Sequence, residues 1–187
     1  MTNQTAPTDE TATDSDLPVF PAEAPSAVTD PSTAISLLVP VLDRLTDVVD
    51  VPPDAFERPT PCRNFTVAEL RNHVLAWLQF FAAALDDPDG ESERIDPESW
   101  SVDARDDPAA IGEYIVHGWD LSVATGRQWS VSDNAAEQAR LFLEGIVSPE
   151  YRGEDSGFFG EQIAVPGDAP MLERLLGFAG RNPQWTS

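Results

Sequence analysis

The stretch PAAIGEYIVHGWDLSVATG, residues 108–126, predicts the central helix of an all-α protein. Proline suits the first turn of a helix, and Gly126 suits the left-handed position that ends one. Apolar side chains surround a carboxylate, Glu113, and an imidazole, His117 (Ile111, Tyr114, Ile115, Val116 and Trp119). We therefore expect this helix to be buried together with both polar groups.

Glu113 and His117 are four residues apart, so one helical turn places them on the same face. The chain has one other histidine, His73. Two imidazoles and one carboxylate form a known ligand set for a catalytic divalent ion, and these three residues would supply it. The alternatives are a helix-surface pair and a core histidine satisfied by a carboxylate. Burial favours a shared ion, because an unpaired buried charge is costly.

Two further residues each allow two readings. Asp120 lies one turn beyond His117, where it either orients that imidazole or is a solvated acid at the helix edge. Cys62 lies in a proline-rich loop before a predicted helix, whose dipole can lower the pKa of a thiol and make it a nucleophile. A lone cysteine is otherwise a small buried hydrophobe. The sequence has no phosphate-binding glycine loop, Cys-x-x-Cys pattern or serine elbow.

Two helices are predicted before the central one. The first lies in the stretch DPSTAISLLVPVLDRLTDVVDVP, residues 30–52, with Asp30 as its cap, Pro31 at the first helical position, a bend at Pro40 and an apolar stripe (Ile35, Leu38, Leu42, Leu45 and Val49). The second starts at the capping box of Thr66 and Glu69 and runs to about Leu85. Its stripe places His73 at the inner edge (Leu70, Val74, Trp77 and Phe81).

Two helices are predicted after the central one, in residues 132–147 with Ser132 or Asp133 as the cap, and in residues 170–180. Residues 157–166, GFFGEQIAVP, favour a short extended segment. Five helical segments with almost no strand signal predict an all-α fold.

Composition predicts one folded domain, residues 30–187, after an acidic disordered tail, residues 1–29. Residues 86–107 carry ten acids against two arginines and predict a loop. A net charge of −22 without any lysine argues against nucleic acid and anionic membranes as partners. One cysteine, no secretion signal and no long apolar run indicate a cytoplasmic protein.

Three stretches together resemble one family: RPTPCRNFTVAELRNHV (residues 58–74), EYIVHGWDLSVATG (residues 113–126) and APMLERLLGFAGRNPQW (residues 169–185). The chain is identified as a member of the actinobacterial metal-binding proteins related to the N-terminal domain of mycothiol-dependent maleylpyruvate isomerase. That family lies within the DinB/YfiT-like superfamily. The resemblance implies a helical bundle with up to four main helices and a C-terminal helix.

The resemblance also implies that His73, Glu113 and His117 hold a divalent ion, Zn²⁺ in first place, with Ni, Fe or Mn as alternatives. It implies a reaction in which the ion activates a low-molecular-weight thiol, mycothiol, toward a small electrophile. Family members carry a further helix where this chain has residues 86–107. A missing or shortened helix would leave one wall of the bundle for a homodimer partner or the C-terminal helix to cover. The alternatives are a non-catalytic metal-binding or stress-associated bundle, and a helical interaction protein without a metal.

Overall fold

The computed structural model describes residues 31–63, 65–86, 107–153 and 159–186. Its five α-helices are α1 (Pro31–Val49), α2 (Val67–Asp86), α3 (Asp107–Thr125), α4 (Asp133–Ile146) and α5 (Met171–Phe178). Two short 3₁₀ turns, Pro53–Ala55 and Pro149–Tyr151, lie in the connections. The described residues form isolated β-bridges and no strand, so the predicted all-α bundle with a C-terminal helix is confirmed.

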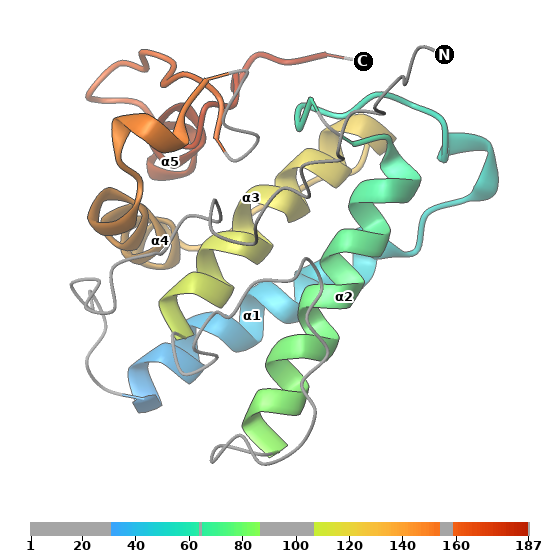
Figure 1. Ribbon diagram of the computed structural model, residues 1–187, viewed down its shortest axis with the longest axis horizontal. Helices are drawn as coiled ribbons and strands as arrows, with labels where there is room; N and C mark the ends of the chain where they lie inside the picture. The colour runs from blue at the N-terminus through green and yellow to red at the C-terminus, as the bar shows by residue number, and fades with distance from the viewer. Residues whose placement is uncertain (1–30, 64, 87–106, 154–158, 187) are drawn as a thin grey trace, which may run out of the picture.

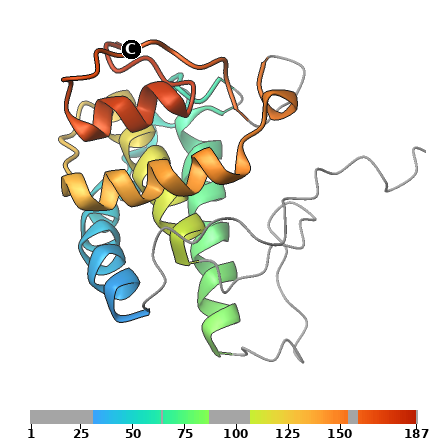
Figure 2. The same ribbon diagram turned by 90° about the vertical axis from the view of Figure 1, so that its left-hand side faces the viewer.

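Helix α3 lies at the centre of the molecule and contacts α1, α2 and α4. Figure 1 shows α2 and α3 side by side and running in opposite directions. Helix α5 packs on α4, and Figure 2 shows that these two cross the direction of the three longer helices. This arrangement places polar residues of α3 between α2 on one side and the C-terminal part of the chain on the other.

Helix α3 is buried on almost every side, as its composition predicts. All residues from 111 to 122 are buried apart from Glu113, which is partly exposed. Gly118 allows the ring of Trp129 to lie directly against the helix backbone, because a Cβ at this position would overlap the ring. Gly126 has a φ of 72°, the left-handed conformation expected where the helix ends.

The predicted apolar stripe of α1 is confirmed in part, because Leu45 is buried and Leu38, Leu42 and Val49 are partly buried against the core, while Ile35 is exposed. Ile35 and Val39 are 58% and 56% exposed. The most deeply buried stripe shares Leu45 with the prediction and otherwise lies one residue earlier (Ala34, Leu37, Val41, Leu45 and Val48). Apolar residues occupy adjacent positions along this helix, so two neighbouring stripes fit the helical period equally well, and packing against α3 selects one. The helix continues through Pro40 without a break.

Helix α2 begins as predicted at a capping box. The Thr66 amide donates to Glu69 Oε2 at 2.8 Å, and the Glu69 amide donates to Thr66 Oγ1 at 3.4 Å. Leu70, Val74 and Trp77 are buried, in agreement with the predicted stripe. The side chain of Phe81 lies outside those that the structure describes.

The C-terminal part resolves two open predictions. Ser132 caps α4, because its hydroxyl accepts a hydrogen bond from the Ala135 amide at 3.2 Å. Residues 159–166 form no strand, although the Ile163 amide bonds the Gly177 carbonyl at 2.9 Å and ties this segment to α5. The predicted tail and most of the acidic segment, residues 87–106, lie outside the described residues. None of the described helices combines the length and apolar character needed to cross a membrane.

Candidate metal centre

The structure brings together the three residues predicted to bind a metal. His73 comes from α2, while Glu113 and His117 lie one turn apart on α3. Glu113 Oε1 lies 2.8 Å from His73 Nε2 and 3.5 Å from His117 Nε2. One ligand atom from each residue lies within 4.8 Å of the other two. Three donor atoms from two helices therefore converge on one point.

The three side chains are shielded but not closed off. The exposed fractions are 11% for His73, 11% for His117 and 22% for Glu113. Burial raises the pKa of the Glu113 carboxyl, but His117, the hydrogen bond with His73 and Arg181 outweigh it, so the pKa lies below its ordinary value. Glu113 is thus ionised at neutral pH, which is the form that binds a cation.

Aromatic rings surround the His73 imidazole. The Phe65 ring lies 5.0 Å from it between centroids, and the Trp77 ring lies 6.2 Å from it in an edge-on arrangement. The His117 imidazole lies 5.1 Å away at an interplanar angle of 84°. These contacts restrict the rotation of His73, so its Nε2 stays directed toward Glu113.

Asp120 holds the other nitrogen of His117. Asp120 Oδ2 lies 3.0 Å from His117 Nδ1, and the Asp120 side chain is fully buried. The reading of Asp120 as a solvated acid is therefore wrong, and the position agrees with an orienting role. A carboxylate on Nδ1 favours the tautomer with a proton there, which directs the lone pair of Nε2 toward Glu113 and His73.

Arg181 completes this network from the segment after α5. Its Nη2 and Nε lie 3.2 and 3.4 Å from Asp120 Oδ2, and its Nη1 donates to the Ala179 carbonyl at 2.9 Å. Burial lowers the pKa of Arg181, but the charge of Asp120 outweighs it and the pKa is raised. Sequence reasoning missed this role, because Arg181 is 61 residues from its partner. The available signal was that Arg181 is the only charged residue in residues 175–187, a mostly apolar segment.

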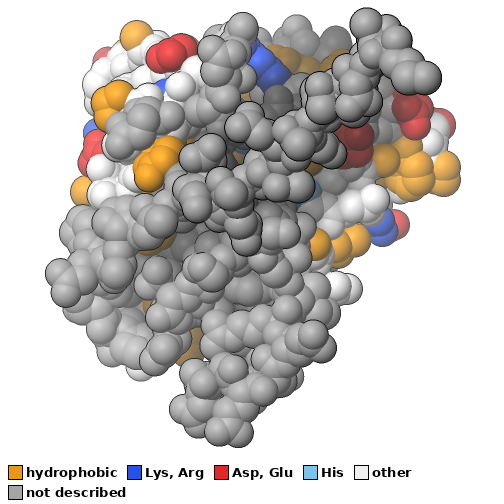
Figure 3. Space-filling model, viewed as in Figure 1, with side chains coloured by type: hydrophobic (Ala, Val, Ile, Leu, Met, Phe, Trp, Pro, Cys, Tyr) orange, Lys and Arg blue, Asp and Glu red, His pale blue; other side chains and the backbone are white. Residues whose placement is uncertain are grey.

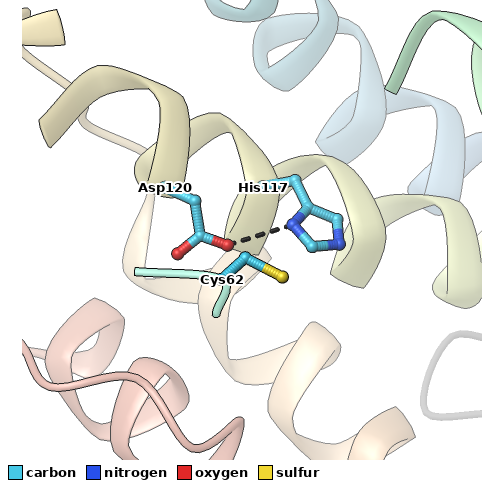
Figure 4. Close-up of side chains that lie close together, drawn as sticks. All are labelled: Cys62, His117 and Asp120. Carbon is cyan, nitrogen blue, oxygen red and sulfur yellow. Dashed lines mark hydrogen bonds and ion pairs between the residues drawn. The ribbon is translucent and has the colours of Figure 1, made fainter. Parts of the chain in front are cut away.

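Cys62 lies on the same side of His117 as Asp120. Its carbonyl accepts hydrogen bonds from Thr60 Oγ1 at 2.8 Å and from the Phe65 amide at 3.0 Å, which fix the loop before α2. Figure 4 shows the thiol directed toward the His117 ring and the hydrogen bond between His117 and Asp120. Cys62 is partly buried against the core, and its role as a nucleophile stays a prediction.

The donor set fits a divalent ion. Two imidazole nitrogens with one ionised carboxylate suit Zn²⁺ and also Ni²⁺, Fe²⁺ or Mn²⁺, and they leave coordination positions for water or another ligand. On the face of the molecule in Figure 3, acids and arginines among the described side chains lie at separate places around the edge.

Comparison with known proteins matches the part of the chain that holds these residues to one family model. Residues 38–128, which contain all three predicted ligands, match the model of the mycothiol maleylpyruvate isomerase N-terminal domain. Two uncharacterized proteins of Mycobacterium tuberculosis, from strains CDC 1551 / Oshkosh and ATCC 25618 / H37Rv, are each 29% identical over 69 residues. The match covers 37% of this chain and 37% of each relative, so the chain spans little more than a third of the curated relatives it matches. No solved structure matches the chain.

Proposed function

Because residues 38–128 match the model of the mycothiol maleylpyruvate isomerase N-terminal domain, we propose a metal-dependent function. The protein binds a divalent ion through His73, Glu113 and His117. It uses that site to bring a low-molecular-weight thiol of the mycothiol type to a small electrophile. Transfer to the electrophile, or isomerisation through a thiol adduct, is the reaction class.

The observation that carries this proposal is the convergence of three donor atoms within 4.8 Å, supplied by two helices of the matched domain. Held there, a divalent ion lowers the pKa of a coordinating thiol, so that the thiol is a nucleophile at neutral pH. Imidazole and carboxylate ligands with open positions are a usual catalytic set for Zn²⁺, and they also accept Mn²⁺, Fe²⁺ or Ni²⁺.

The chain's own residues act as ligands and supports. Glu113 supplies the anionic ligand, and its 22% exposure leaves an approach from solvent for a thiol and an electrophile. His117 keeps its lone pair on the metal side through Asp120, and Asp120 is fixed by Arg181. These contacts support a site that is preorganised before any ion binds.

Metal analysis tests the ligand assignment. Protein purified without added metal, or titrated with Zn²⁺, is expected to hold about one equivalent. His73→Ala, Glu113→Gln and His117→Ala should each lower the affinity for Mn²⁺, an ion that does not favour thiolate ligands, at least tenfold. Glu144→Gln is the matched control, because it removes an α4 carboxylate outside the site. Wild-type metal content in His117→Ala would overturn the assignment.

A thiol-dependent assay separates an enzyme from a binding protein. We expect the metal-loaded protein with mycothiol to consume maleylpyruvate or a model electrophile, and His117→Ala to lose this activity. Metal binding without thiol-dependent turnover would leave the second candidate, a non-catalytic metal-binding bundle. A chain that neither binds a divalent ion nor reacts would be a helical interaction protein.

A further inference from the structure

We propose that Cys62, His117 and Asp120 form a second metal site for a thiophilic divalent ion such as Zn²⁺. This site is occupied in place of the group formed by His73, Glu113 and His117, not in addition to it. The proposal concerns different residues and does not depend on the thiol reaction described above.

The first argument is the geometry of the donors. The Cys62 sulfur, a ring nitrogen of His117 and a carboxylate oxygen of Asp120 all lie within 4.8 Å of one another. Around a tetrahedral Zn²⁺, such atoms would be about 3.3 to 3.6 Å apart, given Zn–S near 2.3 Å and Zn–N near 2.0 Å. Side-chain adjustments of about 1 Å would therefore complete the site. Figure 4 shows the thiol on the loop and the other two groups on one turn of α3.

The second argument is a carboxylate oxygen without a partner. Asp120 is fully buried, and its Oδ2 takes the hydrogen bonds of His117 and Arg181. Its Oδ1 has no hydrogen-bond partner in the described part of the chain. A buried polar atom left in this state is costly, and a bound cation would satisfy it.

The charges around the group also permit an ion. Arg181 opposes a further cation, but it bonds Oδ2 and leaves Oδ1 open. The carboxylate of Asp120 and a metal-bound Cys62 thiolate together carry two negative charges. Arg181 carries one positive charge, so the group has a net negative charge before an ion binds. Cys62 is only partly buried, so an ion can reach the group from solvent.

His117 makes the two groups mutually exclusive. His117 Nε2 faces Glu113, whereas its Nδ1 faces Asp120, and a neutral imidazole has a coordinating lone pair on only one of these nitrogens. Binding at the second group therefore requires the proton to move from Nδ1 to Nε2. Ligand type then decides which group is filled. The thiolate favours Zn²⁺ or Cd²⁺, while two imidazoles and a carboxylate without sulfur also accept Mn²⁺, Fe²⁺ or Ni²⁺.

Titration of the full chain with Co²⁺ tests the proposal, because Cys62 is the only cysteine. A thiolate-to-cobalt charge-transfer band in the near ultraviolet therefore reports Cys62 alone, while the visible d–d bands report cobalt at either group. We expect the wild type to bind one equivalent with the charge-transfer band. Cys62→Ser should lose this band and keep d–d bands, His73→Ala should keep both, and His117→Ala should lose both.

The outcomes separate this inference from the proposed function. Visible bands without a charge-transfer band, in the wild type and in His73→Ala, would overturn the second site and leave the first intact. A second equivalent bound to the wild type would overturn mutual exclusion. Loss of all cobalt in Cys62→Ser, with full binding in His73→Ala, would support the second site and contradict the ligands of the proposed function. Circular dichroism of each variant checks that it is folded.

Discussion

The two sides of His117 differ in how closed they are. On the Nδ1 side, Asp120 is fully buried and Arg181 is 7% exposed. On the Nε2 side, His73 and Glu113 are 11% and 22% exposed. We call these the closed side and the open side. The closed side holds a fixed charge pair inside the fold, whereas the side chains of the open side are partly in contact with solvent.

The His117 imidazole contacts both sides. It therefore links the buried ion pair that stabilises the fold to the candidate metal site. Charges on the closed side must be paired, because water cannot solvate them. Charges on the open side are partly solvated and can tolerate the loss of a partner. Substitutions on the two sides should therefore have different costs.

The largest effect is expected from Arg181→Met, which leaves the buried charge of Asp120 without its partner. Removing one member of a buried ion pair costs about 3 to 5 kcal/mol of unfolding free energy, measured by urea denaturation. The double variant Asp120→Asn with Arg181→Met should regain a large part of this loss, because no charge is left unpaired. If Arg181→Met alone were as stable as wild type, the charges of the closed side would not need to be paired, and the two sides would not differ in this respect.

A smaller loss is expected when the packing of α3 is disturbed near the closed side. Gly118→Val would push a branched side chain into the Trp129 ring, at a cost of about 1 to 3 kcal/mol. Gly112→Ala in the same helix is the control, because its added Cβ meets only Leu143, at 4.0 Å. This change should stabilise the protein by about 0.5 to 1 kcal/mol, since alanine favours a helix over glycine. Equal effects of the two substitutions on thermal unfolding would contradict the packing at Gly118.

On the open side, Glu113→Gln is tested in the metal-free protein. It should have a small effect on stability at neutral pH and a larger effect on how stability changes with pH. The pKa of Glu113 is lowered in the folded state from its ordinary 4.5. Ionised Glu113 therefore stabilises the fold above its unfolded pKa, and this contribution is lost as the pH falls through the lower folded pKa. Denaturation midpoints from pH 7 to pH 3 should fall more steeply for wild type than for the variant. Parallel curves would show that Glu113 does not have a lowered pKa.

The smallest effect is expected from an exposed ion pair far from His117. Arg140 and Glu144 of α4 are 21% and 39% exposed and lie one helical turn apart. Glu144→Gln should cost no more than about 0.5 kcal/mol by urea denaturation, because solvent screens such pairs. If Glu144→Gln cost as much as Arg181→Met, the loss of an ion pair alone would explain both effects, and burial would not matter.

The local patterns of the sequence predict what depends on neighbours in the chain. The capping box of Thr66 and Glu69, the buried stripe of α2 and the shared face of Glu113 and His117 all follow from helical spacing. His73 was expected near the other two because each lies on a core-facing helix. The structure brings the three together, and their role as metal ligands stays a proposal.

Contacts between distant segments could not be predicted in the same way. No spacing rule connects Arg181 with Asp120, or Cys62 with His117, because the pairs meet only after α5 and the loop before α2 pack on α3. The buried stripe of α1 was predicted only in part for a related reason. Its sequence allows two apolar stripes, and only the surface of α3 distinguishes them.

The place of Arg181 along the chain has a consequence for synthesis on the ribosome. His73, Glu113 and His117 are all translated before Arg181, so the candidate ligands exist while the buried carboxylate of Asp120 still lacks its cation. Domains fold as units once their last required segment emerges. The nascent chain can therefore close around this centre only after the residues beyond α5 have left the exit tunnel.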